Sequence, residues 1–390
     1  MKHPQSNLSD TSIGGDNGER PFHSEIVDRI RTQGNIWSLP GGQLLLPEVF
    51  GFCRGVERAL EMLQEAIRQC NNKGRRIFLL GEIIHNPWVN NYFQQQGVGV
   101  LSRRETEQLD RHVTAADCTV IPAFGVPLDV RRRLDDIGCQ VVDTSCGDVR
   151  HLWRWGENAV TQGYAVLIFG RALHDETVVT KSRLAAAGGK YLVVGDLSEA
   201  GQFGEMLVGR APAQEFRERF GPETTNAESP APFEKLALVS QTTMLYDETV
   251  AVRDVVRGAF IRRFGPGGSD ERLLFHPTVC RATQERQSAA LRLCRNRCDL
   301  VVVVGGFGSS NTRHLYELAS RHAPTVFIES AEAIRTEAEI ESLDPAASRC
   351  VVVQNWFPQR RPLRVAVLAG ASCPEVVIGR VLERLAAFLS

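Results

Sequence analysis

The sequence lacks several features that mark specialised classes of protein. No stretch approaches the roughly 20 consecutive apolar residues of a membrane-spanning helix, and strongly apolar runs such as Leu300 to Val304 have only the length of a strand. The segment from Met1 to Arg20 is polar and has no apolar core, which is typical of a short disordered tail and argues against a secretory signal or a membrane anchor. We therefore expect a cytoplasmic protein with no membrane partner.

The chain has no excess of charge of either sign. Its 45 Lys and Arg residues stand against 46 Asp and Glu residues, which gives a net charge of −1. Because no basic field covers the molecule as a whole, the composition does not indicate a nucleic-acid partner. Hydrophobic residues make up 43% of the 390 residues, which is enough for two or three domains with cores of their own.

Cys-x-x-Cys pairs are also absent, which argues against a structural zinc site and against a thioredoxin-like redox pair. Cysteine itself is not scarce, since the chain has ten. Without an export signal, we expect these residues to be thiols or metal ligands and not disulfides. They are Cys53, Cys70, Cys118, Cys139, Cys146, Cys280, Cys294, Cys298, Cys350 and Cys373.

Strand-length apolar runs alternate with helical patterns from about residue 43 onward. The run from Leu44 to Val49, for example, precedes a helical pattern from Arg54 to Cys70. Continuous apolar runs are typical of buried parallel strands, so the predicted fold class is α/β with mostly parallel sheets. We expect a short helix at His23 to Thr32 and further strands at Arg76–Leu80, Thr119–Ala123, Gln140–Asp143, Ala165–Phe169, Tyr191–Val194, Lys235–Ser240, Leu300–Val304, Thr325–Glu329, Val351–Gln354 and Val365–Leu368.

One segment, Asp196 to Glu234, interrupts this alternation. It contains four prolines and many Glu, Gly and Thr residues. We interpret it as an insertion on a surface loop.

Three cysteines occupy equivalent positions, each between the end of a predicted strand and the start of a predicted helix. They are Cys53, Cys146 and Cys280, which lie 93 and 134 residues apart, and the second spacing falls to 95 without the 39 residues of the interrupting segment. The chain therefore has the pattern of three similar α/β units, each with one cysteine. Helix starts favour thiolate over thiol, and strand ends are where α/β sheets bind ligands. Three converging thiols would hold either a zinc ion or an iron–sulfur cluster with one open position.

Polar residues follow other predicted strands at the same kind of turn. Glycine-rich turns with hydroxyl and amide groups at helix starts bind anions, and two such turns indicate a phosphate or diphosphate. The candidate residues at these turns are His85, His174, Glu176, Thr242, Ser309, Ser310, Asn311 and Ser372.

These motifs together resemble those of the 4-hydroxy-3-methylbut-2-enyl diphosphate reductases (IspH/LytB) of the non-mevalonate isoprenoid pathway. In order, the similar stretches cover about residues 45 to 390. They are Gly51–Ala59, Glu82–Val89, Asp143–Cys146, His174–Glu176, Gln241–Thr243, Val279–Gln287, Ser309–Thr312 and Ala369–Ser372.

The resemblance implies a pseudo-threefold trefoil of three similar α/β domains around a central [4Fe–4S] cluster. Cys53, Cys146 and Cys280 would hold the cluster and leave its fourth iron free for the substrate hydroxyl. The implied divisions are an N-terminal extension at 1–42, partly disordered, and domains at 43–145, 146–277 and 278–390, the second with an insertion at 196–234.

The resemblance also implies the roles of the polar residues in a reductive dehydroxylation that yields isopentenyl and dimethylallyl diphosphate. Glu176 would supply a proton to the leaving hydroxyl, Thr242 would orient that relay, and His174 would take part in both binding and catalysis. A small electron donor such as ferredoxin or flavodoxin and a monomeric state are implied as well. The residues that would bind the allylic diphosphate substrate are His85, His174, Thr242, Ser309, Ser310, Asn311 and Ser372.

The chain departs from the family pattern at several positions of the expected site. Phe124 replaces a histidine that binds the diphosphate, which removes a contact commonly worth about 1.5–3 kcal/mol. Gly147 and Asp148 replace a Pro-Leu pair, and Asp175 replaces a proline. Val179 and Gly308 replace a glycine and an asparagine.

Three alternatives to this function follow from the residues. The first is an iron–sulfur reductase of the same family that acts on another substrate. The second is a non-catalytic sensor of oxygen or iron, which would need no proton donor. The third is a zinc hydrolase with three cysteine ligands, which would be colourless where a cluster is brown.

Overall fold

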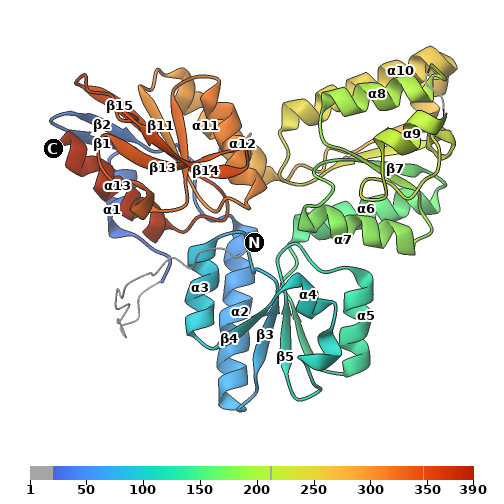
Figure 1. The fold of residues 1–390 in the computed structure, drawn as a ribbon, viewed down its shortest axis with the longest axis horizontal. Coiled ribbons are helices and arrows are strands. Elements are labelled where there is room, and N and C mark those ends of the chain that lie inside the picture. Colours follow the sequence, from blue (N-terminus) through green and yellow to red (C-terminus); the bar gives the residue numbers. More distant parts are fainter. Residues whose placement is uncertain (1–20, 211–212, 346) are drawn as a thin grey trace.

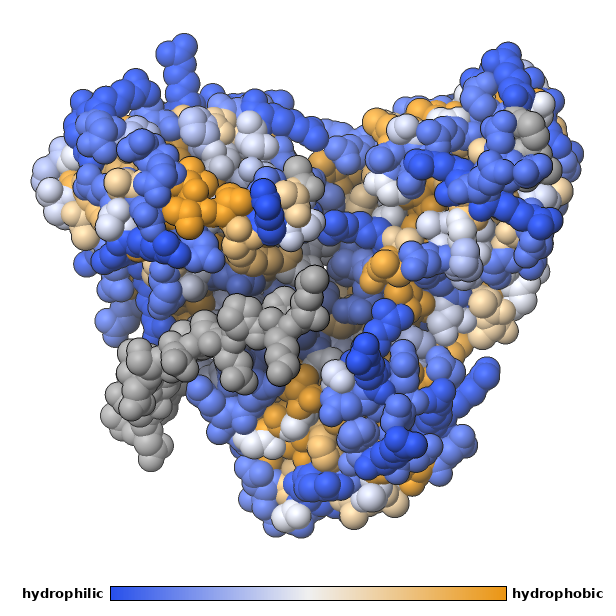
Figure 2. Space-filling model, in the orientation of Figure 1, coloured by the Kyte–Doolittle hydropathy of each residue, from blue (hydrophilic) through white to orange (hydrophobic). Residues whose placement is uncertain are grey.

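The computed structural model of the chain describes residues 21–210, 213–345 and 347–390. Three lobes, each built on a sheet of its own, are arranged as a triangle around a common centre (Figure 1). The surface is mostly hydrophilic, with a notch between the second and third lobes (Figure 2). In the described part of the chain, no helix has both the length and the apolar character that crossing a membrane requires. The predicted tail at residues 1–20 lies outside the described residues.

The first lobe is a four-stranded, fully parallel sheet in the order β4-β3-β5-β6. Its main helix buries the apolar face that the sequence predicts, including Leu60 and Leu63, against this sheet. The strands are β3 (Ile77–Leu80), β4 (Val98–Leu101), β5 (Cys118–Ile121) and β6 (Gln140–Asp143), and the helices are α2 (Arg54–Asn72), α3 (Pro87–Gln95), α4 (Arg103–Thr106), the 3₁₀ turn η1 (Leu109–Arg111) and α5 (Leu128–Ile137).

The second lobe is also a four-stranded parallel sheet, in the order β10-β9-β7-β8. Its central strands β7 and β9 are buried along their whole length, as continuous apolar runs predict. The strands are β7 (Ala165–Phe169), β8 (Tyr191–Val194), β9 (Leu236–Ser240) and β10 (Leu273–Phe275), and the helices are α6 (Gly147–Thr161), α7 (Asp175–Ala186), α8 (Leu197–Leu207), α9 (Ala213–Arg219), the 3₁₀ turn η2 (Ala231–Glu234) and α10 (Tyr246–Arg272).

The third lobe has a five-stranded sheet in the order β1-β2-β15-β11-β12, parallel except for the β1–β2 pair. The α/β class with mostly parallel sheets is thus confirmed in all three lobes. The strands are β1 (Ile36–Leu39), β2 (Gly42–Leu45), β11 (Leu300–Val304), β12 (Thr325–Ile328), β13 (Glu339–Asp344), β14 (Arg349–Gln354) and β15 (Leu363–Ala369), and the helices are α1 (Glu25–Thr32), α11 (Arg281–Arg295), α12 (Ser310–Ser320), the 3₁₀ turn η3 (Ala331–Ala333) and α13 (Glu375–Leu389).

The predicted boundary at residue 43 is wrong, because the segment on both sides of it belongs to the third lobe. Strand β2 pairs with β15, and the buried side chains Val27, Ile30 and Leu44 lie in the core of that lobe. Ion pairs reinforce the contact of α1 with α13: the guanidinium of Arg31 lies 3.1 Å from Asp28 and also contacts Glu375. The apolar pattern predicts that this strand is buried, but it does not determine which sheet buries it.

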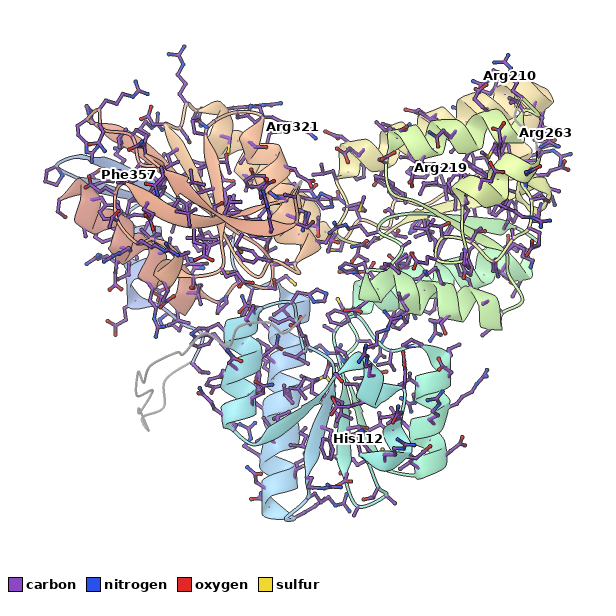
Figure 3. All side chains as sticks on the ribbon, viewed as in Figure 1. His112, Arg210, Arg219, Arg263, Arg321 and Phe357 are labelled. Carbon is purple, nitrogen blue, oxygen red and sulfur yellow. The ribbon has the colours of Figure 1, made fainter. Side chains whose placement is uncertain are left out.

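The segment Asp196–Glu234 is not a surface-loop insertion. Helix α8 is the connection between β8 and β9 and packs against α10 (Figure 1), and the fully buried Phe203, Phe216 and Phe233 belong to the lobe core. Ion pairs fasten the segment to α10, such as that of Glu234 with Arg263, which is labelled in Figure 3. Because α8 is a regular crossover helix, removing all 39 residues from the cysteine spacing is not justified.

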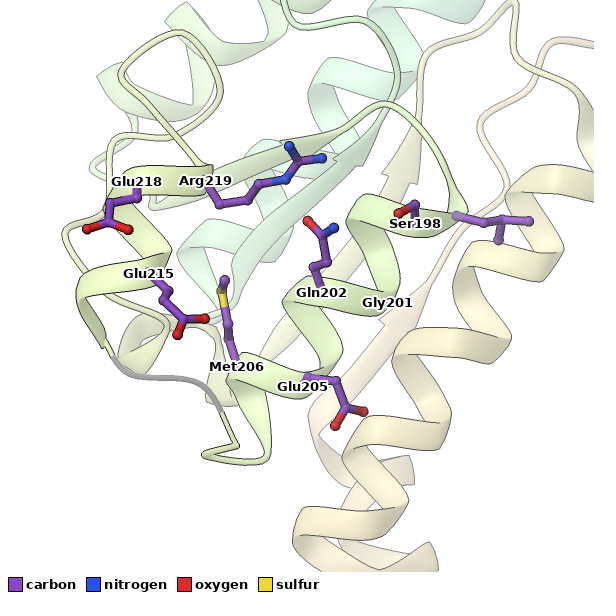
Figure 4. A pocket seen from close by; sticks show the side chains of 9 residues that line it. Ser198, Gly201, Gln202, Glu205, Met206, Glu215, Glu218 and Arg219 are labelled. Atoms are coloured by element: carbon purple, nitrogen blue, oxygen red, sulfur yellow. The ribbon is translucent and has the colours of Figure 1, made fainter.

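Helices α8 and α9 enclose a cavity of about 700 Å³ on the outer side of the second lobe (Figure 4). The charged groups at this cavity are Glu205, Glu215, Glu218 and Arg219. None of the three matched cysteines lines it.

The strand at Val351–Gln354 also differs from its prediction. It belongs to β14, which forms an antiparallel hairpin with β13, and its residues are alternately exposed and half-buried. A run of four Val and Cys residues predicts a buried parallel strand, whereas in the structure one face of the hairpin is open to solvent.

Phe203 provides a test of the packing of this segment. We expect Phe203→Ala to lower the free energy of unfolding by about 3–5 kcal/mol, because it empties a fully buried site. Urea denaturation followed by circular dichroism measures this loss. The exposed neighbour Gln202 gives the control, and Gln202→Ala should change the value by less than about 0.5 kcal/mol. Equal small losses for both variants would show that the segment is a peripheral insertion.

Candidate functional site

One helix in each lobe begins at one of the three matched cysteines. Cys53 is the N-cap of α2, Cys146 is the N-cap of α6 and Cys280 is the N-cap of α11. All three are half-buried and free of disulfide bonds. The helix starts direct unpaired N–H groups and partial positive charge toward these positions.

The backbone N–H of each cysteine donates a hydrogen bond to a neighbouring lobe. The N–H of Cys146 donates to the carbonyl of Ala123 in the first lobe at 2.8 Å, and the N–H of Cys280 donates to Thr242 in the second at 2.9 Å. The N–H of Cys53 donates to Ala371 in the third lobe at 3.3 Å. These bonds form a cyclic set, so each lobe holds the cysteine turn of the next.

The three thiols lie close together at the centre of this ring. A Cβ atom added to Gly55 would lie 2.8 Å from the Sγ of Cys146 and 3.8 Å from that of Cys53. Burial, together with the neighbouring charge of Cys53, raises the pKa of Cys146, and burial raises the pKa of Cys280 to about 12. Thiols in this setting need a cation to hold them as thiolates.

The spacing of the sulfurs separates two kinds of metal site. Three sulfurs on one zinc ion, each at about 2.3 Å from the metal, would lie within about 4.6 Å of one another. Among the described residues, the group whose ligand atoms all lie within 4.8 Å of one another is His23, Asp28 and Glu375, and the cysteines form no such group. That histidine–carboxylate group already holds the guanidinium of Arg31. The three sulfurs are therefore not gathered as closely as three ligands of one zinc ion, and this spacing suits a larger cluster.

Two residues of α11 support the cysteine ring, and the sequence did not single them out. The guanidinium of the buried Arg286 donates to the carbonyls of Gly51 at 2.8 and 3.1 Å and of Phe52 at 2.8 Å, which fixes the turn before Cys53. The hydroxyl of Thr283 lies 3.1 Å from the Sγ of Cys280. Both lie in the stretch Val279–Gln287 that resembles the family, three and six residues after Cys280, but that stretch gave neither of them a role.

A buried carboxyl group lies beside the ring. Glu176 is 3% exposed, and its two oxygens accept from the N–H of Thr242 at 2.7 Å and from the Oγ1 of Thr242 at 2.6 Å. Burial raises the pKa of Glu176 to about 7, although both contacts with Thr242 act in the opposite direction. At neutral pH this group can therefore both give and take a proton.

His174 caps α7 next to this carboxyl group. Its Nδ1 accepts from the N–H of Glu176 at 3.3 Å, so the neutral ring carries its proton on Nε2. Burial, and then the positive charges of His85, Arg171 and His314, lower the pKa of His174 to about 3. The ring is thus a neutral donor, and its buried Nε2 has no partner among the described residues.

Phe124 and His85 form a stacked pair, with ring centroids 4.5 Å apart and planes 9° from parallel. The Nδ1 of His85 lies 3.0 Å from the carboxylate of Glu82, whereas Asp175 lies 3.7 Å from Nε2, beyond hydrogen-bond reach. The substituted phenylalanine therefore supplies no hydrogen bond but covers one face of the histidine. His85 and His174 meet edge to face at 5.4 Å.

The hydroxyl and amide groups at the start of α12 join this cluster. The hydroxyl of Ser372 lies 3.2 Å from the Oγ of Ser309 and 3.4 Å from the carbonyl oxygen of His85, and it can donate its one proton to either. Asn311 donates to the Oγ1 of Thr283 at 3.3 Å and accepts from the N–H of Ala371 at 3.0 Å. The structure thus connects Ser309, Asn311 and Ser372 to His85 and to the cysteine ring.

Several buried polar atoms of this cluster have no partner among the described residues, namely the Nε2 atoms of His85 and His174 and the Oγ of Ser310. Buried polar atoms are almost always paired, so an unpaired group of them indicates the place of a polar ligand. Together with the start of α12, they suit an anion.

Comparison with known proteins finds relatives of this chain over most of its length. The model of the LytB protein family matches residues 44–386. The 4-hydroxy-3-methylbut-2-enyl diphosphate reductase of Synechococcus sp. (strain CC9311) is 36% identical over 373 residues, which cover 95% of this chain and 91% of the relative. That of Prochlorococcus marinus (strain MIT 9301) is 33% identical over 369 residues, 94% of this chain and 91% of the relative.

Two solved structures are similar. One is a (E)-4-hydroxy-3-methyl-but-2-enyl diphosphate reductase, described as the terminal enzyme of the non-mevalonate pathway; at 26% identity its TM-score is 0.54, with 88% of this chain and 98% of that chain covered. The other, from Plasmodium falciparum, has a TM-score of 0.64 at 20% identity over 87% and 86% of the two chains, which shows the fold alone. The chain belongs to the LytB protein family.

The raised pKa of Glu176 predicts a pH dependence of stability. Between pH 4.5 and about 7 the folded protein binds more protons at this group than the unfolded chain, so stability falls as pH rises through this window. Glu176→Gln should remove this dependence. The difference in the free energy of unfolding between the variant and the unmodified protein should therefore change by up to ~1.4 kcal/mol per pH unit. Urea denaturation of both proteins across the window measures it. Parallel pH profiles would contradict the burial of an ionisable group here.

Proposed function

We propose that the protein reduces (E)-4-hydroxy-3-methylbut-2-enyl diphosphate to isopentenyl and dimethylallyl diphosphate, the last step of the non-mevalonate isoprenoid pathway. The observation that carries this proposal is the buried Glu176–Thr242 pair. It is bonded on one side to the turn of Cys280, through the carbonyl of Thr242, and on the other side to His174. A proton donor thus lies between the thiols and the anion-binding cluster.

Cys53, Cys146 and Cys280 would hold a [4Fe–4S] cluster. Their half-buried sulfurs are spaced too widely for one zinc ion, and glycine at position 55 leaves room between two of them. When bound, such a cluster supplies electrons and offers its fourth iron to the substrate hydroxyl. A small electron donor such as ferredoxin or flavodoxin would deliver the electrons to a monomeric enzyme.

The polar cluster would hold the diphosphate. The unpaired donors His174 and Ser310, together with the backbone N–H groups at the start of α12, would bind its oxygens. Ser309, Ser372 and Asn311 would place these groups through their mutual hydrogen bonds. The substrate hydroxyl would then point from this cluster toward the thiols, past Glu176.

Glu176 and Thr242 would move the proton that the reaction requires. Removing a hydroxyl group reductively uses two electrons and two protons: the C–O bond breaks, the oxygen leaves as water with one proton, and the carbon skeleton takes the other. With a pKa of about 7, Glu176 can supply the first proton, and Thr242 orients it by contacting both carboxyl oxygens.

The same features weigh against two alternatives. A zinc hydrolase does not fit the width of the cysteine triad. A sensor would have no use for a buried carboxyl group of raised pKa beside unpaired anion donors. The remaining alternative is a family member that acts on another substrate. It would differ from the proposed enzyme in one measurement, because it would not turn over hydroxymethylbutenyl diphosphate.

Glu176→Gln tests the proposed proton donor. In protein purified without oxygen and supplied with a dithionite-reduced dye, we expect this variant to keep the broad visible absorption of the cluster and to lose turnover of hydroxymethylbutenyl diphosphate by about 100-fold or more. The exposed Glu65 gives the control, since Glu65→Gln should leave turnover unchanged. A sensor would show no turnover in any variant, and an unmodified protein with an intact cluster but no turnover would exclude this substrate.

Gly55→Ala tests the cysteine ring. The added methyl group would lie 2.8 Å from the Sγ of Cys146, so the sulfur would have to move, and we expect less iron per chain and weaker visible absorption. Gly147→Ala is the matched control at the next helix start, because a Cβ there meets nothing within 4 Å. If both variants bind as much iron as the unmodified protein, the cluster does not lie between these sulfurs.

A further inference from the structure

The expected anion site has lost one ring donor. Phe124 stands where a histidine would donate to the diphosphate, and it stacks on His85 without offering a hydrogen bond. A diphosphate carries several negative charges, and each charge-assisted contact commonly contributes about 1.5–3 kcal/mol. A replacement donor would have to be a buried side chain, close to His174 and Ser310, with a polar atom that nothing else engages.

His314 on α12 has these properties. It lies one helical turn after Ser310, and residues four apart share a helix face. The residue is 7% exposed, and its buried Nε2 has no partner among the described residues. Ser310 and His314 therefore present two unpaired buried polar atoms from adjacent turns of one helix.

Glu317 fixes the orientation of this ring. The Nδ1 of His314 lies 2.7 Å from the Oε2 of Glu317, and a carboxylate can only accept, so Nδ1 carries a proton. Burial alone would raise the pKa of Glu317, but His314, Arg313 and Arg171 hold it below its usual range. The pairing turns Nε2 away from Glu317, and a protonated ring would donate from that atom with its charge offset by the carboxylate.

His314 lies near enough to His174 for its charge to act on that ring. The positive charge of His314, after burial and the charges of His85 and Arg171, contributes to the lowered pKa of His174. Arg313, the neighbour of His314, also has an unpaired buried Nε. Positive and neutral donors thus gather where the second and third lobes meet, and Glu317 is the carboxylate that contacts His314.

We propose that His314 is a further substrate-binding residue that donates from Nε2 to the diphosphate, with Glu317 as its positioning residue. This inference rests on the proposed function for the identity of the ligand. A site with a histidine at position 124 would take its donor from that residue. In this chain the donor comes from the third lobe, one turn inside the helix whose start already faces the anion.

Two substitutions of His314 distinguish this role from a structural one. The amide nitrogen of glutamine reaches the place of Nε2, whereas that of asparagine reaches only the place of Nδ1. If Nε2 binds the diphosphate, His314→Gln should weaken the binding of inorganic diphosphate by about 3- to 10-fold, and His314→Asn by about 10-fold or more. If the ring serves only to bond Glu317, the order should reverse, and that result would overturn the proposal.

The measurement is calorimetric titration of the cluster-containing protein with inorganic diphosphate, supported by steady-state kinetics. We expect KM of the His314 variants to rise in step with the weaker binding while kcat stays within about 2-fold, as for a contact equal in ground and transition states. Glu317→Gln should weaken binding less than His314→Asn. His322→Gln is the matched control, because His322 is exposed just beyond the end of α12, and it should bind like the unmodified protein.

The outcomes separate this proposal from the proposed function. Unmodified protein that binds inorganic diphosphate through His314 but does not turn over the substrate would refute the proposed reaction and retain the donor. Turnover with His314 variants that bind inorganic diphosphate like the unmodified protein would refute the donor and retain the reaction. Failure of the unmodified protein to bind inorganic diphosphate at millimolar concentration would overturn the assignment of His314.

Discussion

The arrangement of the whole molecule depends on three backbone hydrogen bonds. The amides of Cys53, Cys146 and Cys280 each donate to a strand-end carbonyl of the lobe before them in the ring. Because every lobe both gives and receives one such bond, no cysteine can shift without disturbing two lobes. The thiols are thus positioned by the packing of the lobes, and Arg286 adds a second link by holding the turn before Cys53 from α11.

The chemistry beside this ring follows from the removal of water. His174 and Glu176 lie together at the start of α7, and burial favours the neutral form of both: it raises the pKa of Glu176 to about 7 and lowers the pKa of His174 to about 3. The same burial leaves Nε2 of His174, Oγ of Ser310 and Nε2 of His314 without partners. Burying unpaired polar atoms costs free energy, and an anion that formed hydrogen bonds with them would offset that cost.

The sequence predicts those parts of the structure that depend on local pattern. Strands such as Gln140–Asp143 and Leu300–Val304 are found where their apolar runs place them, and the cysteine positions at helix starts follow from the same alternation. Contacts between segments far apart in the sequence could not be predicted, because no local pattern encodes them. The stacking of Phe124 on His85 is one case, and the pairing of β2 with β15 is another. For His314, the spacing to Glu317 was a usable signal, but an i, i+3 pair also occurs on ordinary exposed helix faces.

The third lobe joins the two ends of the chain. Its sheet contains Gly42–Leu45 beside Leu363–Ala369, while the sheets of the other two lobes are each made from one continuous stretch of sequence. During synthesis the first and second lobes can therefore fold as soon as they emerge, whereas α1, β1 and β2 must wait for almost the entire protein to be made. Closing so long a loop is slow, and the apolar surface of the early segment stays exposed until it closes. The ring of cysteine turns, which needs all three lobes, consequently belongs to the last stage of folding.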